Sequence, residues 1–208
     1  MTLTRNTIVF CLGLFCVTGI SYAQSANVYF GAGSAMDSSS NQQIDTFGTG
    51  TPFTTPTLSG VFMDLGASVL LTKTLGVGAD VSWRATHVPY AGLQLMPIFY
   101  DFDGIYAPIS GKRFDSELHA GLGGMSLRYS LNQQQCDAFA GCSNYSQSIE
   151  SSNHFQLHFG AAVRYYLTDH VFVRPSIDGH YVTNLFQFGS NIVPEFSVGV
   201  GYSFGREQ

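Results

Sequence analysis

Hydrophobic and polar residues alternate along most of this chain with the two-residue period of a β-strand. The pattern is clearest between Val193 and Phe204, where the even positions from Phe196 onward are apolar and the odd positions from Glu195 to Ser203 are small or polar. Successive side chains of a strand point to opposite sides, so one face of this segment is apolar and the other holds its only charge. The same polarity recurs upstream, which indicates a sheet with one apolar and one charge-bearing face.

The alternation predicts eight strands joined by connections of uneven length. We expect the strands at about residues 25–36, 60–72, 75–86, 93–103, 113–130, 153–168, 171–182 and 193–204. Two connections, 36–58 and 132–152, are predicted to be long polar loops, and those at 73–74 and 168–170 to be tight turns.

Two of these strands are less regular than the others. The two faces of 93–103 cannot be told apart by composition, and Pro97 removes one hydrogen-bond donor from that strand. In 113–130, Gly123-Gly124 predicts a bulge that shifts the phase, so that Met125, Leu127 and Tyr129 continue the apolar face of Leu118.

Composition favours a membrane over water as the surroundings of the apolar face. Charged residues make up 11% of the 208 residues, against about 25% in soluble domains. Apart from the N-terminal segment, no apolar run has the roughly 18–20 residues of a spanning helix, so strands would have to cross the bilayer. An open sheet edge in lipid would leave backbone groups unpaired. The predicted fold is therefore all-β, a closed antiparallel up-and-down transmembrane β-barrel of eight strands.

The first 23 residues have the features of a secretory signal. A basic residue, Arg5, precedes an apolar stretch from Ile8 to Ile20, and the small residues Ser21 and Ala23 suit a cleavage site. We expect residues 1–23 to be removed and residues 24–208 to form the barrel. Two cysteines, Cys136 and Cys142, then stay in an exported chain, where oxidation favours a disulfide between them.

The chain resembles the eight-stranded outer-membrane β-barrel family that includes the OmpA transmembrane domain, OmpX and the Opa-type proteins. The most specific feature is at the end of the chain, where Gly199, Tyr202 and Phe204 match the family's assembly signal, although Val198 stands at its polar position. The resemblance implies recognition by the barrel assembly machinery, contact with lipid and lipopolysaccharide of a Gram-negative outer membrane, and periplasmic mature termini.

The charge-bearing faces would collect ionisable side chains inside the barrel. These are Asp64, Asp80, Arg84, Glu117, His119, His158, Arg164, Arg174, Asp178, His180 and Glu195. Eight strands enclose a lumen just wide enough for side chains to fill, and buried charges need partners. The expected neighbours are Asp64 with Arg84, Glu117 with Arg164, and Asp178 with His158. The alternative is a narrow water-filled pore gated by such pairs.

Other chemistry has little support in the sequence. His154 and His158 are about 13 Å apart on a strand, and His158 with His180 lacks a third ligand, so no metal site and no cofactor are predicted. Lipid-modifying enzymes of this architecture need a His, a Ser and an acid on the outer wall, where only His87 is a candidate, so no catalytic residues are predicted.

The functional expectation is a non-enzymatic, monomeric outer-membrane barrel with exposed external loops. Its role would be in envelope structure or in surface interaction such as adhesion, and the sequence does not identify a partner of the loops. The net charge of −5 gives no indication of a nucleic-acid partner, and none is predicted. Two non-enzymatic alternatives stay open. One is the small pore, and the other is a secreted ligand-binding barrel like the lipocalins, which would need apolar residues inside and polar ones outside.

Overall fold

The computed structural model describes residues 25–37, 42–45, 48–90, 92–137, 141–185 and 190–205. The predicted secretory signal, residues 1–23, lies outside these ranges. No helix in the described part of the chain has the length and hydropathy needed to cross a membrane.

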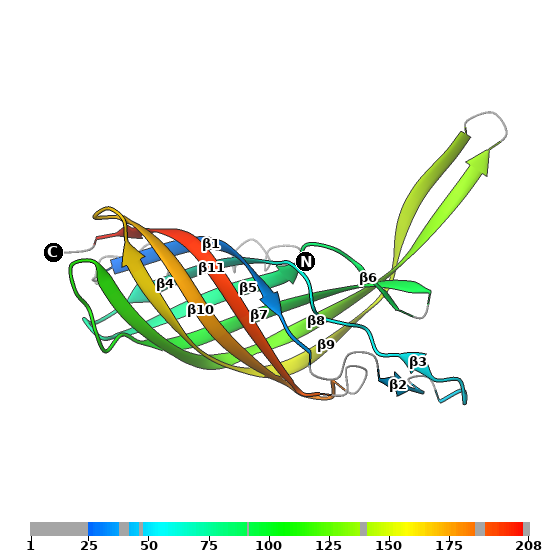
Figure 1. Ribbon diagram of the computed structural model, residues 1–208, viewed down its shortest axis with the longest axis horizontal. Coiled ribbons are helices and arrows are strands. Elements are labelled where there is room, and N and C mark those ends of the chain that lie inside the picture. Colours follow the sequence, from blue (N-terminus) through cyan, green and yellow to red (C-terminus); the bar gives the residue numbers. More distant parts are fainter. Residues whose placement is uncertain are drawn as a thin grey trace, which may run out of the picture.

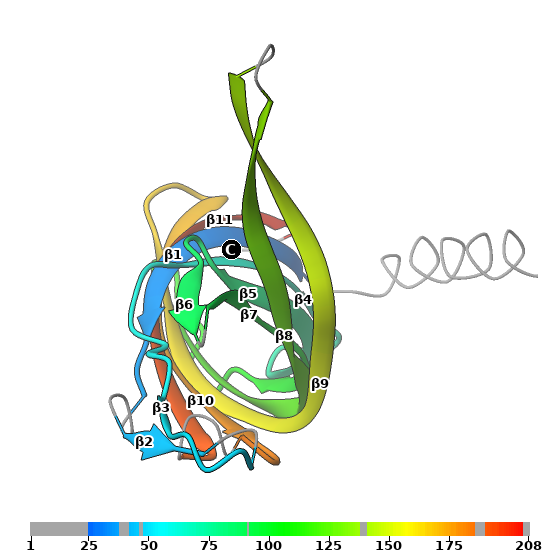
Figure 2. The same cartoon turned by 90° about the vertical axis from the view of Figure 1, so that its right-hand side faces the viewer.

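Eight long antiparallel strands form the wall of the molecule (Figures 1 and 2). The strands are β1 (Ser25–Ala35), β4 (Phe62–Leu70), β5 (Leu75–Arg84), β7 (Leu93–Tyr106), β8 (Phe114–Asp137), β9 (Gly141–Tyr166), β10 (Val171–Val182) and β11 (Ile192–Phe204). Each pairs with its neighbours, and the β5–β7 pairing together with the β1–β11 pairing closes the sheet on itself. The closed eight-stranded antiparallel barrel that the sequence predicted is confirmed.

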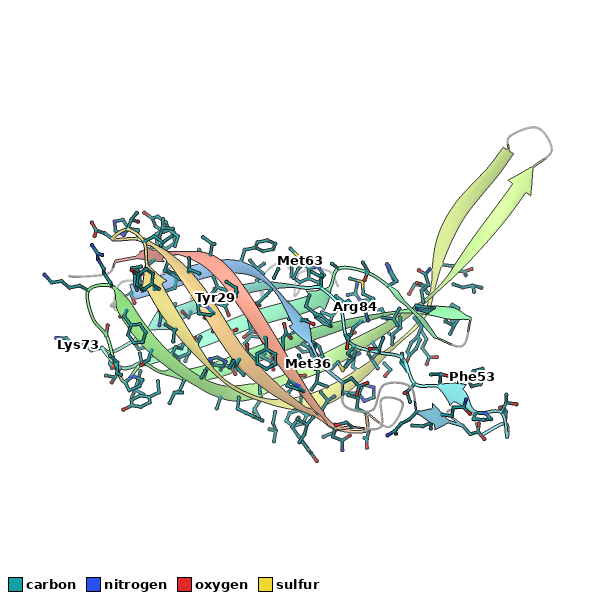
Figure 3. The ribbon with its side chains drawn as sticks, in the orientation of Figure 1. Tyr29, Met36, Phe53, Met63, Lys73 and Arg84 are labelled. Atoms are coloured by element: carbon teal, nitrogen blue, oxygen red, sulfur yellow. The ribbon has the colours of Figure 1, made fainter. Side chains whose placement is uncertain are left out.

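Short turns gather at one end of the barrel. The turns after β4 and β9 are built alike, because a threonine near the start of each accepts hydrogen bonds from the next backbone amides: Thr72 from Leu75, and Thr168 from Val171. Lys73 marks this end in Figure 3, while Phe53 lies at the opposite end, where the longer connections are. The first residues of β1 and the last of β11 are at the tight-turn end.

The sides of the strands follow the alternation. Apolar side chains on the outside are 50–69% exposed at Phe30, Phe102, Leu122, Ile177 and Val198. Most charged side chains of the same strands are buried in the lumen, and Arg128, near the outer end of the barrel part of β8, is an exposed exception. In hydrocarbon such an apolar surface is stable, because it holds few polar groups that would lose their hydration. In water, exposing the same surface would be unfavourable.

The structure resolves the ambiguous strand β7. Leu95, Phe99, Asp101 and Asp103 point inward and are at most 7% exposed. Pairing with β5 ends at Ile98 and pairing with β6 (Val88–Tyr90) begins at Leu95. Pro97 lies in the gap between these two partners, where a missing donor is tolerated.

The predicted phase shift at Gly123-Gly124 is wrong. The pairing of β8 with β7 and β9 runs without interruption through these glycines, and the register shift comes later, between Tyr129 and Ser130. Met125 and Leu127 are therefore inside the barrel and fully buried. The alternation keeps its phase, and what changes is the chemistry of the lumen at this level, from charged to apolar.

The two long connections also contain structure. Most of 132–152, predicted as a loop, continues β8 and β9 as a two-stranded ribbon that projects beyond the barrel (Figures 1 and 2). Segment 36–58 holds the short hairpin of β2 (Gln43–Ile44) and β3 (Phe53–Thr54). Neither segment has one apolar face, because outside the barrel neither face is turned to hydrocarbon, so alternation gave no signal for them.

Candidate functional site

The ionisable side chains singled out in the sequence meet in the middle of the lumen. Ten of the eleven lie there. The eleventh, Arg84, lies nearer the outer mouth, where its Nη1 donates a 2.6 Å hydrogen bond to the Thr57 carbonyl. The strands tilt around a common axis, so inward-facing side chains from neighbouring strands reach the same depth in the lumen.

Glu117 on β8 is the centre of a buried ion-pair cluster. Its two carboxylate oxygens contact two guanidinium groups, with Arg164 Nη2 at 3.0 Å and Arg174 Nη2 at 2.8 Å. Arg174 also lies over the ring of Tyr29, 4.2 Å from its centroid. All three charges are nearly inaccessible to water, so each depends on the others for neutralisation.

Three histidines on adjacent strands form a column beside this cluster. His119, His158 and His180 come from β8, β9 and β10, with ring centroids 5.1 Å and 4.8 Å apart, and His180 stacks on Phe99 at 4.5 Å. The column follows from register, since His158 is opposite His180 on β10 and opposite Gly121 on β8, two residues from His119.

Each histidine lies between two carboxylates. His119 is 2.6 Å from Asp178 and 3.5 Å from Glu117. His158 is 3.0 Å from Asp103 and 3.6 Å from Asp178. His180 is 3.6 Å from Asp101 and 3.5 Å from Glu195. Such imidazoles can carry a proton shared with an acid or offer a nitrogen to a cation.

Gly160 makes one of these contacts geometrically feasible. It is directly opposite His119 on β8 and opposite Asp178 on β10, so the three positions form a row across three strands. A Cβ at position 160 would collide with both His119 Nε2 and Asp178 Oδ1. The absent side chain lets two residues on non-adjacent strands, roughly 10 Å apart in backbone, meet at hydrogen-bond distance.

Hydroxyl groups complete the polar layer on the other side of the lumen. Ser82 donates to Glu195 at 2.7 Å, and Ser197 donates to Asp64 at 3.1 Å. Asp64 was expected beside Arg84, and this expected pair is wrong, because the two residues are at different depths. The other expected neighbours, Glu117 with Arg164 and Asp178 with His158, are present.

Sequence reasoning missed two acids of this layer, Asp101 and Asp103. Both are on β7, whose faces looked alike. Gln156 Nε2 donates a hydrogen bond to Asp101 at 2.6 Å, and His158 Nδ1 lies 3.0 Å from a carboxylate oxygen of Asp103. A usable signal existed, since the two acids are two positions apart and therefore share a face, and the other strands place most of their charges inward.

Apolar side chains close the lumen at the outer mouth, above the polar layer. We call this cluster the outer plug. It consists of Ala35, Leu58, Phe62, Val88, Leu95, Phe99, Met125, Leu127, Val182, Leu185 and Val193, each at most 4% exposed. Toward the tight turns, Tyr29, Tyr166 and Phe172 form a second apolar cluster. Phe172 is fully buried and therefore lies inside the barrel.

Between the two apolar clusters lies a small cavity. Its volume is about 10 Å³, and its lining includes Asp64, Asp80, His119, His158 and Asp178. This volume is about that of one water molecule or one ion. The space is far too small for an organic ligand, which a lipocalin-like function would require.

Two other predicted features have known positions. In β11, Tyr202 and Phe204 point outward with ring centroids 4.7 Å apart, while Gly199 packs against Gly31 of β1. Cys136 and Cys142 are directly opposite each other near the tip of the β8–β9 ribbon. Their side chains lie outside the described part of the structure, so the disulfide stays a prediction.

Comparison with known proteins supports the fold. No family model matches the chain, and no curated protein matches it. Among solved structures, the barrel is similar to Neisserial surface protein A (17% identity, TM-score 0.53), covering 88% of this chain and 98% of that one. It is also similar to Ail, the attachment invasion locus protein of Yersinia pestis, crystallised with the heparin analogue sucrose octasulfate (12%, 0.53, 86% and 98%).

A third similar structure is the N-terminal β-barrel domain of Pseudomonas aeruginosa OprF, with 16% identity, a TM-score of 0.50, and coverage of 88% of this chain and 98% of that chain. These identities are low enough that the comparison establishes a shared fold and nothing about activity. The fold shared with these solved structures is that of the eight-stranded outer-membrane barrels, as the sequence resemblance implied.

Proposed function

We propose that this chain is a non-enzymatic integral protein of a Gram-negative outer membrane that presents the β8–β9 ribbon to the outside of the cell. The observation that carries the proposal is the sidedness of the closed barrel. Apolar side chains cover its outer face, whereas nearly all charges of the spanning strands lie in the lumen. A bilayer is the medium in which such a surface is stable.

The proposed orientation follows from the two ends of the barrel. Barrels of this kind have short turns on the periplasmic side and longer connections outside. The tight turns after β4 and β9, with the first residues of β1 and the last residues of β11, would then face the periplasm. β11, with Gly199, Tyr202 and Phe204, would be available to the assembly machinery, and the outer wall would contact lipid and lipopolysaccharide as a monomer.

The packing of the lumen favours a scaffold over a pore. The outer plug fills the mouth with eleven apolar residues that exclude water, and beneath it Glu117 forms ion pairs with Arg164 and Arg174. An ion would have to be stripped of its hydration shell to pass the plug.

The ribbon is the part of the chain that we expect to contact a partner outside the cell. Seven residues of β8, from Leu131 to Asp137, extend past the last residue that pairs with β7, which places the tip roughly 20–25 Å farther out. Loops displayed by a rigid barrel commonly carry binding. Ail, the attachment invasion locus protein of Yersinia pestis, has a similar fold. We propose that the ribbon of this chain likewise mediates attachment to a surface.

A disulfide between Cys136 and Cys142 would brace the ribbon. Isolated two-stranded ribbons are only marginally stable in water, and a covalent link near the tip would hold the strands in register. The position of the two residues on opposite strands, in register, suits this role.

The test separates the membrane assignment from the contact assignment. Outer-membrane fractions of expressing cells should contain the protein, which should run faster on a gel unboiled than boiled. A variant with residues 132–147 replaced by a two-residue turn should keep this mobility shift and lose attachment of the cells to immobilised matrix proteins, glycans or cell layers. Removal of residues 42–54 is the matched control. A soluble protein would refute the membrane assignment, and unchanged attachment would refute the role of the ribbon.

A further inference from the structure

The lumen contains a set of side chains whose chemistry matches a metal site. We propose that His119, His158 and Asp178 bind one divalent first-row transition metal ion of the zinc type in the cavity at the centre of the barrel. This assignment depends on the closed lumen and not on the surface role of the ribbon.

The three candidate ligand atoms already converge. Asp178 Oδ1 is 2.6 Å from His119 Nε2 and 3.6 Å from His158 Nε2, and all three residues line the small cavity. Around a zinc ion with bonds of about 2.0 Å, neighbouring ligand atoms are roughly 3.3 Å apart. Moving His119 and Asp178 apart by less than about 1 Å would reach that spacing, which a small side-chain rotation provides.

The opposite nitrogen of each imidazole is oriented as metal-binding histidines require. His158 Nδ1 is 3.0 Å from both oxygens of Asp103, and His119 Nδ1 is 3.5 Å from Glu117. A carboxylate behind a ligating histidine fixes the ring and makes the free nitrogen a better donor to the metal. Ser176 does the same for Asp178, donating to its other oxygen at 2.7 Å.

One ligand atom points into this site without a hydrogen bond. His158 Nε2 is buried, has no hydrogen-bond partner in the described part of the chain, and belongs to a side chain that is 2% exposed. A buried polar atom left in this state costs free energy, and a metal ion would satisfy it. His158 also takes part in each of the three groups of side chains whose ligand atoms lie within 4.8 Å of one another.

The charges around the cavity favour a cation. Seven carboxylates, those of Asp64, Asp80, Asp101, Asp103, Glu117, Asp178 and Glu195, face two guanidinium groups, those of Arg164 and Arg174. Two imidazole nitrogens with one carboxylate select zinc-like ions over calcium or magnesium, which prefer oxygen alone. The cavity is about the size of one such ion, and Asp80, which also lines it, would supply the fourth ligand.

The alternative occupant of the site is a proton. If each histidine were protonated and paired with its carboxylates, the same geometry would need no metal. Cobalt distinguishes the two cases, because a four-coordinate Co²⁺ ion absorbs visible light much more strongly, and at longer wavelength, than six-coordinate aqueous Co²⁺. The apolar clusters at both ends enclose the cavity, so the ion should be present while the purified chain refolds from urea into detergent micelles.

We expect wild-type protein refolded with Co²⁺ to retain one equivalent after desalting, with the four-coordinate spectrum, and Zn²⁺ to displace it when present during refolding. H158Q should reduce bound cobalt by more than about tenfold, and D103N, which changes a positioning residue, should weaken affinity by about 10- to 100-fold. Gly160→Ala should also abolish binding while every ligand is kept. H154Q is the matched control, since His154 is on the same strand and outside the site.

The unboiled mobility shift verifies that each variant is folded. Folded wild-type protein that retains no cobalt would overturn the proposal and leave the protonated arrangement. Retention of one equivalent of cobalt by folded H158Q would overturn it as well. Loss of cobalt binding in H180Q but not in the His119→Gln variant would place the site at Asp101, His158 and His180, which contradicts the proposed ligands.

Discussion

The middle of the lumen and its outer mouth are both inward-facing, yet they are stabilised in opposite ways. In the middle, Glu117, Arg164 and Arg174 are buried as an ion-paired cluster. At the mouth, Phe99, Met125 and Leu127 belong to a plug without charges. The first region is stable only while every charge keeps its ion-pair partner. The second is stable because apolar side chains fill its volume. Burial alone therefore does not tell which substitutions a lumen position tolerates.

The largest effect should come from breaking the charged cluster. Glu117→Leu would leave two buried guanidinium groups without their acid, and we expect a loss of about 3–5 kcal/mol in the free energy of unfolding. Urea unfolding in detergent, followed by fluorescence of the single tryptophan, Trp83, measures it. Glu150→Gln, at an exposed position of the ribbon, should change stability by less than about 0.5 kcal/mol. An equally small change for Glu117→Leu would show that the cluster contributes little.

Opening the plug should cost slightly less, and should have a second consequence. Leu127→Ala removes a fully buried side chain and should destabilise the barrel by about 2–5 kcal/mol. In planar bilayers the wild-type protein should give no discrete channel openings, whereas a double replacement of Phe99 and Leu127 by alanine should raise the leak. Discrete openings in the wild-type protein would contradict the closed mouth.

Placing a charge outside the barrel distinguishes the lumen from the lipid face. Leu122→Arg, at an outward position that is 55% exposed, should cost about 2–4 kcal/mol in a bilayer, where the guanidinium group would face hydrocarbon. The comparison variant is Leu122→Ala, which should cost much less. If the arginine variant unfolded at the same urea concentration as the alanine variant, the outer face would not be in hydrocarbon.

The smallest effect on the barrel should come from the ribbon. Cys136→Ser should shift the urea midpoint of the barrel by an amount near the experimental error, because the predicted disulfide closes a short loop outside the membrane. The same change should make the ribbon easier to cut with protease on intact cells. Alkylation without reductant tests the pairing directly, since two free thiols in the wild-type protein would exclude the disulfide.

The outer face could be predicted from sequence because lipid sets a single requirement for it along every strand. That is why positions such as Ile177 and Val198 followed alternation without exception. The lumen has no single requirement. Where it changes from charged to apolar, Met125 looked like a residue of the other face, and a bulge was inferred that the pairing does not contain.

The sequence predicted which residues belong to the central site better than it predicted which of them contact one another. Inward charges could be named from parity, but their partners depend on depth, which comes from strand tilt and register over the whole barrel. Arg84 and Asp64 share a face and still do not meet. Gly160 gave no chemical signal at all, although its missing side chain brings His119 and Asp178 together.

The seam between β1 and β11 has a consequence for timing. Ala26 pairs with Phe204, so the earliest strand to emerge from a ribosome receives its second neighbour only after the latest one has been made. Until then β1 has one edge with nothing to bond, and partial barrels in lipid are unfavourable. Insertion should therefore follow synthesis rather than accompany it, and the waiting polypeptide must be kept from aggregating on its way to the membrane.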